Sequence, residues 1–229
     1  MFCSEISPDV SGRSSTGKRT NRSRNDRLPK SGLFAGTTLA LPRPAATEGR
    51  DYTSGMDHAD HVSLLRQGVD GAGLVWADFG AGAGAFTLAL ADLLGAGGEI
   101  HAVDRQRNSL CTNEAAMRQR FPGTAVRYLK ADFTQPVELP PLDGIVFANA
   151  LHFQVEQEAV VRLLRGYLRP GGRLILVEYN IEHGNFAVPY PVPFAIWERM
   201  AAGAGFEHTK VLARRPSSFF HEIYSALSW

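Results

Sequence analysis

Three glycines at alternate positions, Gly80, Gly82 and Gly84, interrupt an apolar run that begins near Trp76 and precede a helical pattern. Glycine has no Cβ, so such a turn can take positive φ and bring its backbone N–H groups within contact distance of a ligand. The stretch therefore predicts a strand, a tight ligand-binding turn and the start of a helix. Gly80, Gly82 and Ala85 also fit the dinucleotide pattern G-x-G-x-x-G/A, so the turn alone does not identify the ligand.

Acidic residues stand near this turn and at the ends of later apolar segments. Asp78 lies two positions before Gly80, and Asp104 ends the segment Glu99–Asp104, 20 positions after Gly84. A third acid, Asp132, follows the next apolar segment. Carboxyl ends of parallel strands meet at one edge of a sheet, where ligands of open α/β sheets bind.

Apolar segments alternate with helical patterns through most of the chain, which predicts a parallel sheet with helices on both faces. The expected strands are 74–79, 99–104, 125–129, 142–148 and 173–178, and the expected helices are 57–66, 85–94, 106–120, 156–168 and 196–204. After a proline-rich loop that follows Tyr179, segments 206–212 and 218–227 are expected to form a hairpin joined at Arg214–Ser217. In the first helix, Asp57 is expected to be the N-cap, and a metal site at His58 and His61 lacks a third ligand.

The 229 residues, 44% of them hydrophobic, predict one domain with an extension. Residues 1–50 hold 9 Lys/Arg and 4 Asp/Glu, a net charge of +5, whereas residues 51–229 hold 15 and 19, a net charge of −4. We expect residues 1–55 to be a disordered, basic, Ser/Arg-rich extension and residues 56–229 to be the folded domain. A transit peptide, a nucleic-acid-binding arm and a natural start at Met56 remain alternatives for the extension.

The chain has no apolar run of the roughly 18 residues that span a bilayer. Its two cysteines, Cys3 and Cys111, cannot form a disulfide framework and match no metal-ligand spacing. We therefore expect a cytoplasmic protein that binds no metal.

Over about residues 57–229 the sequence resembles the class I S-adenosylmethionine-dependent methyltransferases. The resemblance is carried by Asp78-x-Gly80-x-Gly82-x-Gly84 after the first strand, Asp104 ending the second, Ala131-Asp132-Phe133 after the third, and Leu168-Arg169-Pro170-Gly171-Gly172 entering the fifth. A dinucleotide dehydrogenase would be expected to continue with a further βαβ half, where this chain has a proline-rich loop and a hairpin. The resemblance therefore favours S-adenosyl-L-methionine as the cofactor.

The resemblance implies a Rossmann-like three-layer α/β sandwich with a seven-stranded, mostly parallel sheet in the order 3-2-1-4-5-7-6 and strand 7 antiparallel. It also implies that Gly80, Gly82 and Gly84 approach the methionine and ribose parts of the cofactor. Asp104 would bind the ribose hydroxyls, Asp78 the methionine ammonium, Asp132 the adenine amino group, and Phe133 would lie beside the adenine ring. The alternatives are that Asp78 caps the turn, Asp104 is an exposed strand-end acid, Asp132 stabilises a local turn and Phe133 is a core residue.

The methyl acceptor is expected between the loops that follow the fourth and fifth strands. His152 is the candidate general base, because imidazole titrates near neutral pH, and Asn149 would line the pocket or orient the methionine end. Tyr179, Asn180, His183 and Tyr190 are candidate acceptor-pocket residues, or parts of a packed lid. A structural hydrogen-bonding role is the alternative for His152.

The segment after the fourth strand has neither the Asn/Asp-Pro-Pro-Tyr/Phe motif of amino-methylating DNA enzymes nor the Pro-Cys nucleophile of cytosine C5 methylation. A small-molecule O-, N- or C-methyltransferase is the leading hypothesis. The alternatives are an RNA or protein methyltransferase that uses the basic extension, a non-catalytic relative, and a nicotinamide-dependent oxidoreductase. We expect no association with a membrane. The mildly acidic domain argues against broad binding of nucleic acid.

Overall fold

The computed structural model describes residues 55–69, 75–217 and 220–229, so the expected extension lies almost wholly outside the described residues. In these ranges the α-helices are α1 (His58–Leu65), α2 (Ala85–Leu94), α3 (Arg107–Arg120), α4 (Gln157–Tyr167) and α5 (Phe194–Gly203). Two short 3₁₀ helices are η1 (Gly95–Gly97) and η2 (Leu151–Phe153). The strands are β1 (Val75–Phe79), β2 (Glu99–Asp104), β3 (Ala125–Lys130), β4 (Leu142–Ala148), β5 (Leu168–Tyr179), β6 (Thr209–Ser217) and β7 (His221–Ser228).

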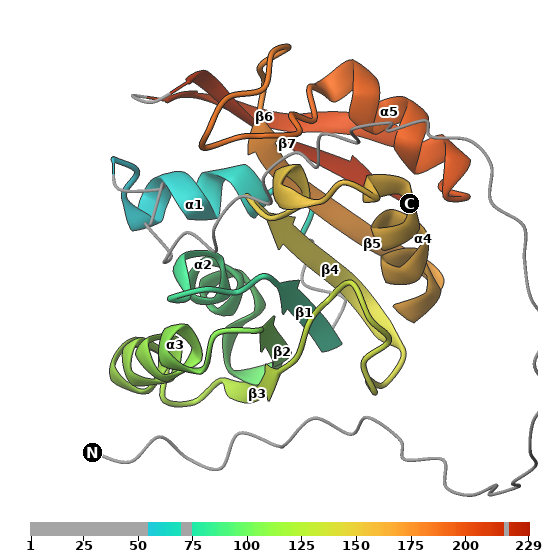
Figure 1. Ribbon diagram of the computed structural model, residues 1–229. Coiled ribbons are helices and arrows are strands. Elements are labelled where there is room, and N and C mark those ends of the chain that lie inside the picture. The colour runs from blue at the N-terminus through green and yellow to red at the C-terminus, as the bar shows by residue number, and fades with distance from the viewer. Residues whose placement is uncertain (1–54, 70–74, 218–219) are drawn as a thin grey trace, which may run out of the picture. The chain divides into compact units, whose positions relative to one another are not determined.

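All seven strands form one sheet in the order β3-β2-β1-β4-β5-β7-β6. Strands β1 to β5 pair in parallel, and β7 pairs antiparallel with both β5 and β6. The strand order and the antiparallel β7 expected from the resemblance are confirmed. Strand order reverses at β1, which lies between β2 and β4 in the centre of the sheet (Figure 1).

Two apolar layers cover the sheet. Helices α1, α2 and α3 lie on one side of it, and α4 and α5 lie on the other (Figure 1). The side chains of β1 alternate between these layers: Trp76 packs with residues of α1 and α2, whereas Ala77 and Phe79 pack with residues of α4 and α5. This burial on both faces explains why β1 is an almost continuous apolar run.

The capping box of α1 confirms the predicted role of Asp57. Its side chain accepts a hydrogen bond from Asp60 N at 2.9 Å, and the Asp60 side chain accepts one from Asp57 N at 3.4 Å. The His58 ring lies 3.1 Å from the Asp92 carboxylate of α2, and the His61 ring packs edge-on against Phe86. Both histidines therefore help to attach α1 to α2.

The predicted hairpin turn at Arg214–Ser217 is wrong. These residues continue β6, where Arg214 pairs with Tyr224 and Ser217 with His221. A proline cannot donate a ladder hydrogen bond, yet Pro216 is tolerated because β6 is an edge strand that pairs with β7 alone. Strand β5 likewise begins earlier than expected, at Leu168, with an irregular register opposite Leu142 and Gly144.

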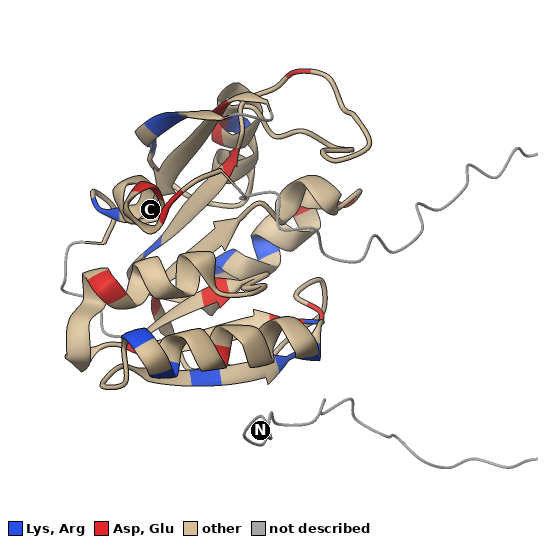
Figure 2. Ribbon diagram, turned by 90° about the vertical axis from the view of Figure 1, so that its left-hand side faces the viewer, with Lys and Arg blue, Asp and Glu red and all other residues tan. Residues whose placement is uncertain are grey.

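No helix within the described parts of the chain is long and apolar enough to cross a membrane. Lys and Arg are interspersed with Asp and Glu on the helices seen in Figure 2.

The contact of Gly144 with Trp76 provides a test of the central packing. A Cβ added to Gly144 would lie 2.5 Å from the Trp76 ring, which is 1% exposed and fixed between α1, α2 and the sheet. Gly144→Ala should therefore destabilise the protein by about 1–3 kcal/mol, measured by urea unfolding, as overpacking of a core does. Gly166→Ala in α4 is the matched control, because no atom lies within 4 Å of the added Cβ. Equal stability of Gly144→Ala and the unmodified protein would contradict this packing.

Candidate cofactor and acceptor site

The glycine turn after β1 has the backbone conformation that its sequence predicts. Gly80, Gly82 and Gly84 have φ values of 73°, 52° and 100°, all in the left-handed region that favours glycine. A Cβ at Gly80 would lie 2.8 Å from Ala150 Cβ, and one at Gly84 would lie 2.6 Å from the Asn113 side chain. The turn is therefore packed closely between the loop after β4 and helix α3, and larger residues at Gly80 or Gly84 would displace it.

Asp104 ends β2 beside this turn. One carboxylate oxygen accepts a hydrogen bond from Gly82 N at 2.9 Å, and the other accepts one from Gln106 N at 2.7 Å. The residue is half-buried. Asp104 thus joins the β2 end to the glycine turn and places a negative charge there, where ribose hydroxyl groups would find an acceptor.

Asp78 is 1% exposed and belongs to a buried polar chain. Thr87 Oγ1 of α2 donates to Asp78 Oδ2 at 2.6 Å, and Asn113 Nδ2 of α3 donates to Thr87 Oγ1 at 2.8 Å. Burial raises the pKa of Asp78 to about 7; the Thr87 hydrogen bond lowers it and the Asp104 charge raises it further. A neighbouring cation would favour the ionised carboxylate, so the ammonium group of a methionine moiety suits this position.

Asp132 and Phe133 follow β3. Asp132 is exposed and accepts hydrogen bonds from Thr134 N at 2.9 Å and Thr134 Oγ1 at 2.8 Å. This local turn is the alternative role considered for Asp132, and it leaves the adenine contact a prediction. Phe133 packs edge-on against Phe147 with centroids 5.2 Å apart, and its ring edge lies 3.7 Å from a Cβ placed at Gly80. Phe133 therefore combines its core contact with a position near the glycine turn.

Asn149 follows β4 and carries the least satisfied polar side chain of the site. Its φ of 49° is unusual for a residue other than glycine, and its N–H donates to Val177 O at 2.9 Å. Both polar atoms of its side chain are buried and have no hydrogen-bond partner among the described residues. An unpaired buried amide costs stability, so Asn149 has the properties of a group that a ligand completes.

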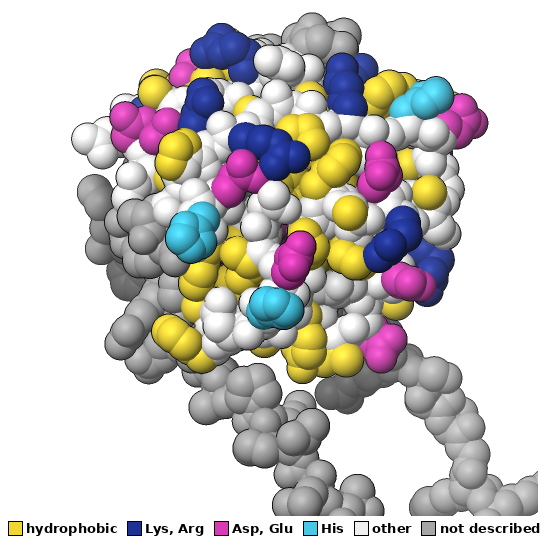
Figure 3. Space-filling view, turned by 90° about the horizontal axis from the view of Figure 1, so that it is seen from above, with side chains coloured by type: hydrophobic (Ala, Val, Ile, Leu, Met, Phe, Trp, Pro, Cys, Tyr) yellow, Lys and Arg dark blue, Asp and Glu magenta, His cyan; other side chains and the backbone are white. Residues whose placement is uncertain are grey.

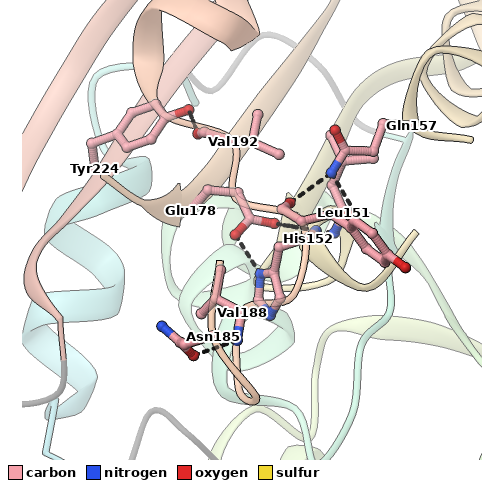
Figure 4. A network of polar contacts seen from close by, with 9 residues as sticks. Leu151, His152, Gln157, Glu178, Asn185, Val188, Val192 and Tyr224 are labelled. Carbon is pink, nitrogen blue, oxygen red and sulfur yellow. Dashed lines mark hydrogen bonds and ion pairs between the residues drawn. The ribbon is translucent and has the colours of Figure 1, made fainter. Parts of the chain in front are cut away.

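A buried acid–base pair is formed by His152 of η2 and Glu178 of β5 (Figure 4). His152 Nδ1 lies 2.6 Å from Glu178 Oε2, and the two side chains are 2% and 0% exposed. The other Glu178 oxygen accepts hydrogen bonds from Leu151 N at 3.1 Å and His152 N at 3.3 Å. The carboxylate therefore favours the tautomer with the proton on Nδ1, which leaves Nε2 as the basic nitrogen.

The loop 180–193 is attached to η2 by main-chain and side-chain hydrogen bonds. Tyr190 N donates to His152 O at 3.0 Å, and Gln157 Nε2 donates to Tyr190 O at 2.7 Å and Leu151 O at 3.3 Å. Tyr224 OH holds the far end of the loop by donating to Val192 O at 2.7 Å (Figure 4). The loops after β4 and β5 are thus brought together, as the acceptor site predicted from the sequence requires.

The candidate acceptor residues have different environments. Tyr179 is buried and packs edge-on against Phe220, while Asn180 bonds the Glu222 side chain and the backbone of Phe194. His183 is exposed and Tyr190 is 41% exposed. Tyr179 and Asn180 accordingly support the loop, whereas Tyr190, whose backbone N–H bonds His152 O, has a partly exposed side chain.

Three residues of this network were missed at the sequence level: Thr87, Asn113 and Glu178. An acid after the apolar run Leu174–Val177 is a signal for Glu178, since a charged residue on a buried central strand requires a partner. Thr87 and Asn113 have no such signal, because polar residues are common in helices and their burial depends on how α2 and α3 pack.

A family model described as a methyltransferase domain matches residues 77–174, from β1 into β5. Residues 77–174 form a class I methyltransferase domain. The methyltransferase family expected from the sequence is thereby confirmed over these residues. The methyltransferase domain thus includes the glycine turn, Asp104, Asp132, Asn149 and His152, while Glu178 lies just beyond the matched range.

Relatives and solved structures agree with this assignment. Acetylserotonin O-methyltransferase of Mus musculus is 30% identical over 137 residues, which cover 49% of this chain and 35% of the mouse protein. This chain therefore spans about a third of the length of that relative.

Magnesium protoporphyrin IX methyltransferase from Synechocystis PCC 6803, solved with bound S-adenosylmethionine, superposes with a TM-score of 0.56 at 19% identity, covering 74% of this chain and 77% of that one. Human N-acetylserotonin methyltransferase, solved with the same cofactor, gives a TM-score of 0.52 at 14% identity, covering 75% of this chain and 56% of that one. At these identities the likeness shows the fold shared with the methyltransferase domain.

The position of Asp104 predicts a role in cofactor affinity. Asp104→Ala should weaken S-adenosylhomocysteine binding more than tenfold, because charge-assisted hydrogen bonds to the ribose would be lost. Isothermal titration measures the affinity, and Asp92→Ala is the control, because Asp92 is an exposed acid near the end of α2 that is remote from the turn. Unchanged affinity in Asp104→Ala would contradict the placement of the ribose beside β2.

The raised pKa of Asp78 predicts a pH-dependent stability in the ligand-free protein. Between its ordinary value of 3.8 and about 7, the folded protein holds a proton that the unfolded chain releases, so the free energy of unfolding falls as pH rises through this window. The Asp78→Asn variant cannot titrate at this position. The Tm of the variant minus the Tm of the unmodified protein should therefore increase between pH 4 and pH 7. A Tm difference that is constant over this range would show that Asp78 does not titrate near pH 7.

Proposed function

We propose that the protein is an S-adenosylmethionine-dependent methyltransferase that methylates a small-molecule acceptor at an atom from which a proton must be removed. The observation that carries the proposal is the buried His152–Glu178 pair, which lies on a loop in contact with the glycine turn through Ala150. A non-catalytic cofactor-binding relative has no need of a desolvated imidazole oriented by a carboxylate.

The residues around the turn fit the cofactor. Gly80, Gly82 and Gly84 would face its methionine and ribose parts, Asp78 its ammonium group, Asp104 its ribose hydroxyls, and Asn149 the methionine end. Asp132 and Phe133 would contact the adenine. The unpaired Asn149 amide and the buried Asp78 carboxyl are the structural observations that support this assignment.

Bound S-adenosylmethionine supplies a methyl group made electrophilic by its sulfonium centre. His152 Nε2 would accept the proton of the acceptor as the new bond to the methyl carbon forms, and Glu178 would stabilise the resulting imidazolium. Because the pair is buried, its charges interact more strongly than they would in water. The loop 180–193, which is bonded to His152 O through Tyr190 N, would help to exclude water from the pair.

The domain boundaries expected from the sequence are part of the proposal: residues 56–229 hold the methyltransferase site and residues 1–55 are an extension. Two of the related proteins are named as methyltransferases of acetylserotonin and of magnesium protoporphyrin IX. These names support a small-molecule acceptor. An RNA or protein acceptor that depends on the basic extension is the second candidate. Under that alternative, RNA binding would weaken steeply with salt and disappear when residues 1–55 are deleted.

Turnover tests the role of His152. The purified protein is incubated with methyl-labelled S-adenosylmethionine and a panel of phenols, amines and cell-extract metabolites, and the release of S-adenosylhomocysteine is measured. With the acceptor found, His152→Ala should lower kcat by about 10²–10⁴-fold, as loss of a general base does. Glu178→Gln should lower kcat less, because the amide oxygen can still accept a hydrogen bond from His152 Nδ1.

The matched control is His208→Ala, since His208 is exposed and precedes β6 at the opposite end of the sheet from the glycine turn. Its kcat should equal that of the unmodified protein. Full activity of His152→Ala, with the unmodified pH profile, would show that His152 is a structural residue.

A further inference from the structure

Large exposed hydrophobic side chains gather at the two loops that form the acceptor side of the site. Within the described ranges, the residues of this kind are Phe153, Val155, Phe186, Tyr190 and Trp229, with exposed fractions of 41%, 69%, 88%, 41% and 40%. All but Trp229 belong to the segment 151–155 after β4 or to the loop 180–193 after β5. Viewed from above, the surface shows hydrophobic side chains lying between charged ones (Figure 3).

We call the four exposed side chains on these two segments the acceptor rim: Phe153, Val155, Phe186 and Tyr190. Tyr190 N donates to His152 O, and the Phe153 ring lies 4.1 Å from the His152 ring, centroid to centroid, at an interplanar angle of 51°. The rim therefore adjoins the base of the proposed reaction. Exposed aromatic rings at such a place lower the free energy of a bound apolar ligand, which removes them from water.

The two segments that carry the acceptor rim contain acidic residues but no Lys or Arg, and the adjacent Arg162 pairs with Glu158. These segments are 149–161 and 174–198, and all of their residues are described. Their acidic residues are Glu156, Glu158, Glu178, Glu182 and Glu198. Carboxylate and phosphate groups are recognised chiefly by Arg, Lys and helix N-termini, so these two segments offer no cation to an anionic acceptor.

The arginines of the neighbouring strand β6 already have acidic partners. Arg214 pairs with Glu222, which also accepts a hydrogen bond from Asn180 at the start of the loop. Arg215 lies 3.7 Å from Asp60 and donates to Ser63 of α1 at 3.1 Å. Their charges are thus compensated within the fold.

We propose, on the basis of the proposed function, that the acceptor is an uncharged aromatic molecule methylated at a phenolic hydroxyl, and that the acceptor rim discriminates against anionic analogues. A phenol has an ordinary pKa of about 10, which an imidazole base can deprotonate as the hydroxyl attacks. The oxygen forms its bond to the methyl carbon, the carbon–sulfur bond breaks with its electron pair on sulfur, and the phenolic proton moves to His152 Nε2. The ring of the acceptor packs against Phe153 and Tyr190.

The selectivity is tested by equilibrium binding to the full chain saturated with S-adenosylhomocysteine. The probes are 2-naphthol and its carboxylated analogue 6-hydroxy-2-naphthoate, which differ by one negative charge. We expect 2-naphthol to bind at least tenfold more tightly, and Phe153→Ala and Tyr190→Ala to weaken its binding. Equal or tighter binding of the carboxylate would overturn the inference.

A variant with an added positive charge tests whether the selectivity between the two probes arises from electrostatics rather than from the shape of the site. Val155→Lys places a cation at the exposed rim and should narrow the difference between the two probes by at least threefold. Gln119→Lys adds the same charge on exposed α3 and should leave the difference unchanged. Equal effects of the two lysines would overturn the role of the rim.

The result also distinguishes this inference from the proposed function. If S-adenosylhomocysteine binds but neither naphthol compound does, the rim serves another occupant, such as a protein partner or a lipid surface, and the inference is overturned while the cofactor assignment stands. If S-adenosylhomocysteine does not bind, the proposed function fails and the inference fails with it.

Discussion

The site depends on the parallel pairing of β1 with β2 on one side and β4 on the other. This pairing brings the carboxyl ends of three strands to one edge, where Gly80 N and Ala81 N both donate to Val103 O of β2. The glycine turn can then approach the loop after β4 until Gly80 and Ala150 are in contact. A sheet with another strand order would separate the acid of β2 from the acid–base pair that follows β4 and β5.

Asp78 and Glu178 are two buried carboxyl groups near this edge, and their environments differ. Asp78 accepts a hydrogen bond from Thr87, which in turn accepts one from Asn113, and burial raises the pKa of Asp78 and favours its neutral form. Glu178 instead accepts hydrogen bonds from two backbone N–H groups, and its other oxygen lies 2.6 Å from the His152 ring. The two environments are those required by the proposed roles, in which Asp78 lies near the ammonium group of the cofactor and Glu178 orients His152.

Much of the fold follows from local sequence signals. The ranges of α2, β2 and β4 agree with the expected ones because glycines and acids bound their apolar runs, and the Asp57 cap is set by residues within one turn. The prediction of a turn at Arg214–Ser217 is wrong, because the proline there suggests a break in the strand. These residues belong to an edge strand, where a proline is tolerated, and that position in the sheet depends on the tertiary structure. Polar contacts between distant elements, such as Glu178 with His152 and Thr87 with Asn113, could not be predicted from the sequence. They depend on how the strands and helices align in the folded protein, which local sequence patterns do not specify.

Thermal unfolding with two candidate ligands tests the central claim that the turn between β1 and α2 holds S-adenosylmethionine rather than a dinucleotide. Added at 100 times its dissociation constant, S-adenosylhomocysteine should stabilise the folded protein by about 2.7 kcal/mol and raise its Tm, whereas NADH should leave the Tm unchanged. Stabilisation by NADH, with no shift from S-adenosylhomocysteine, would contradict the assignment.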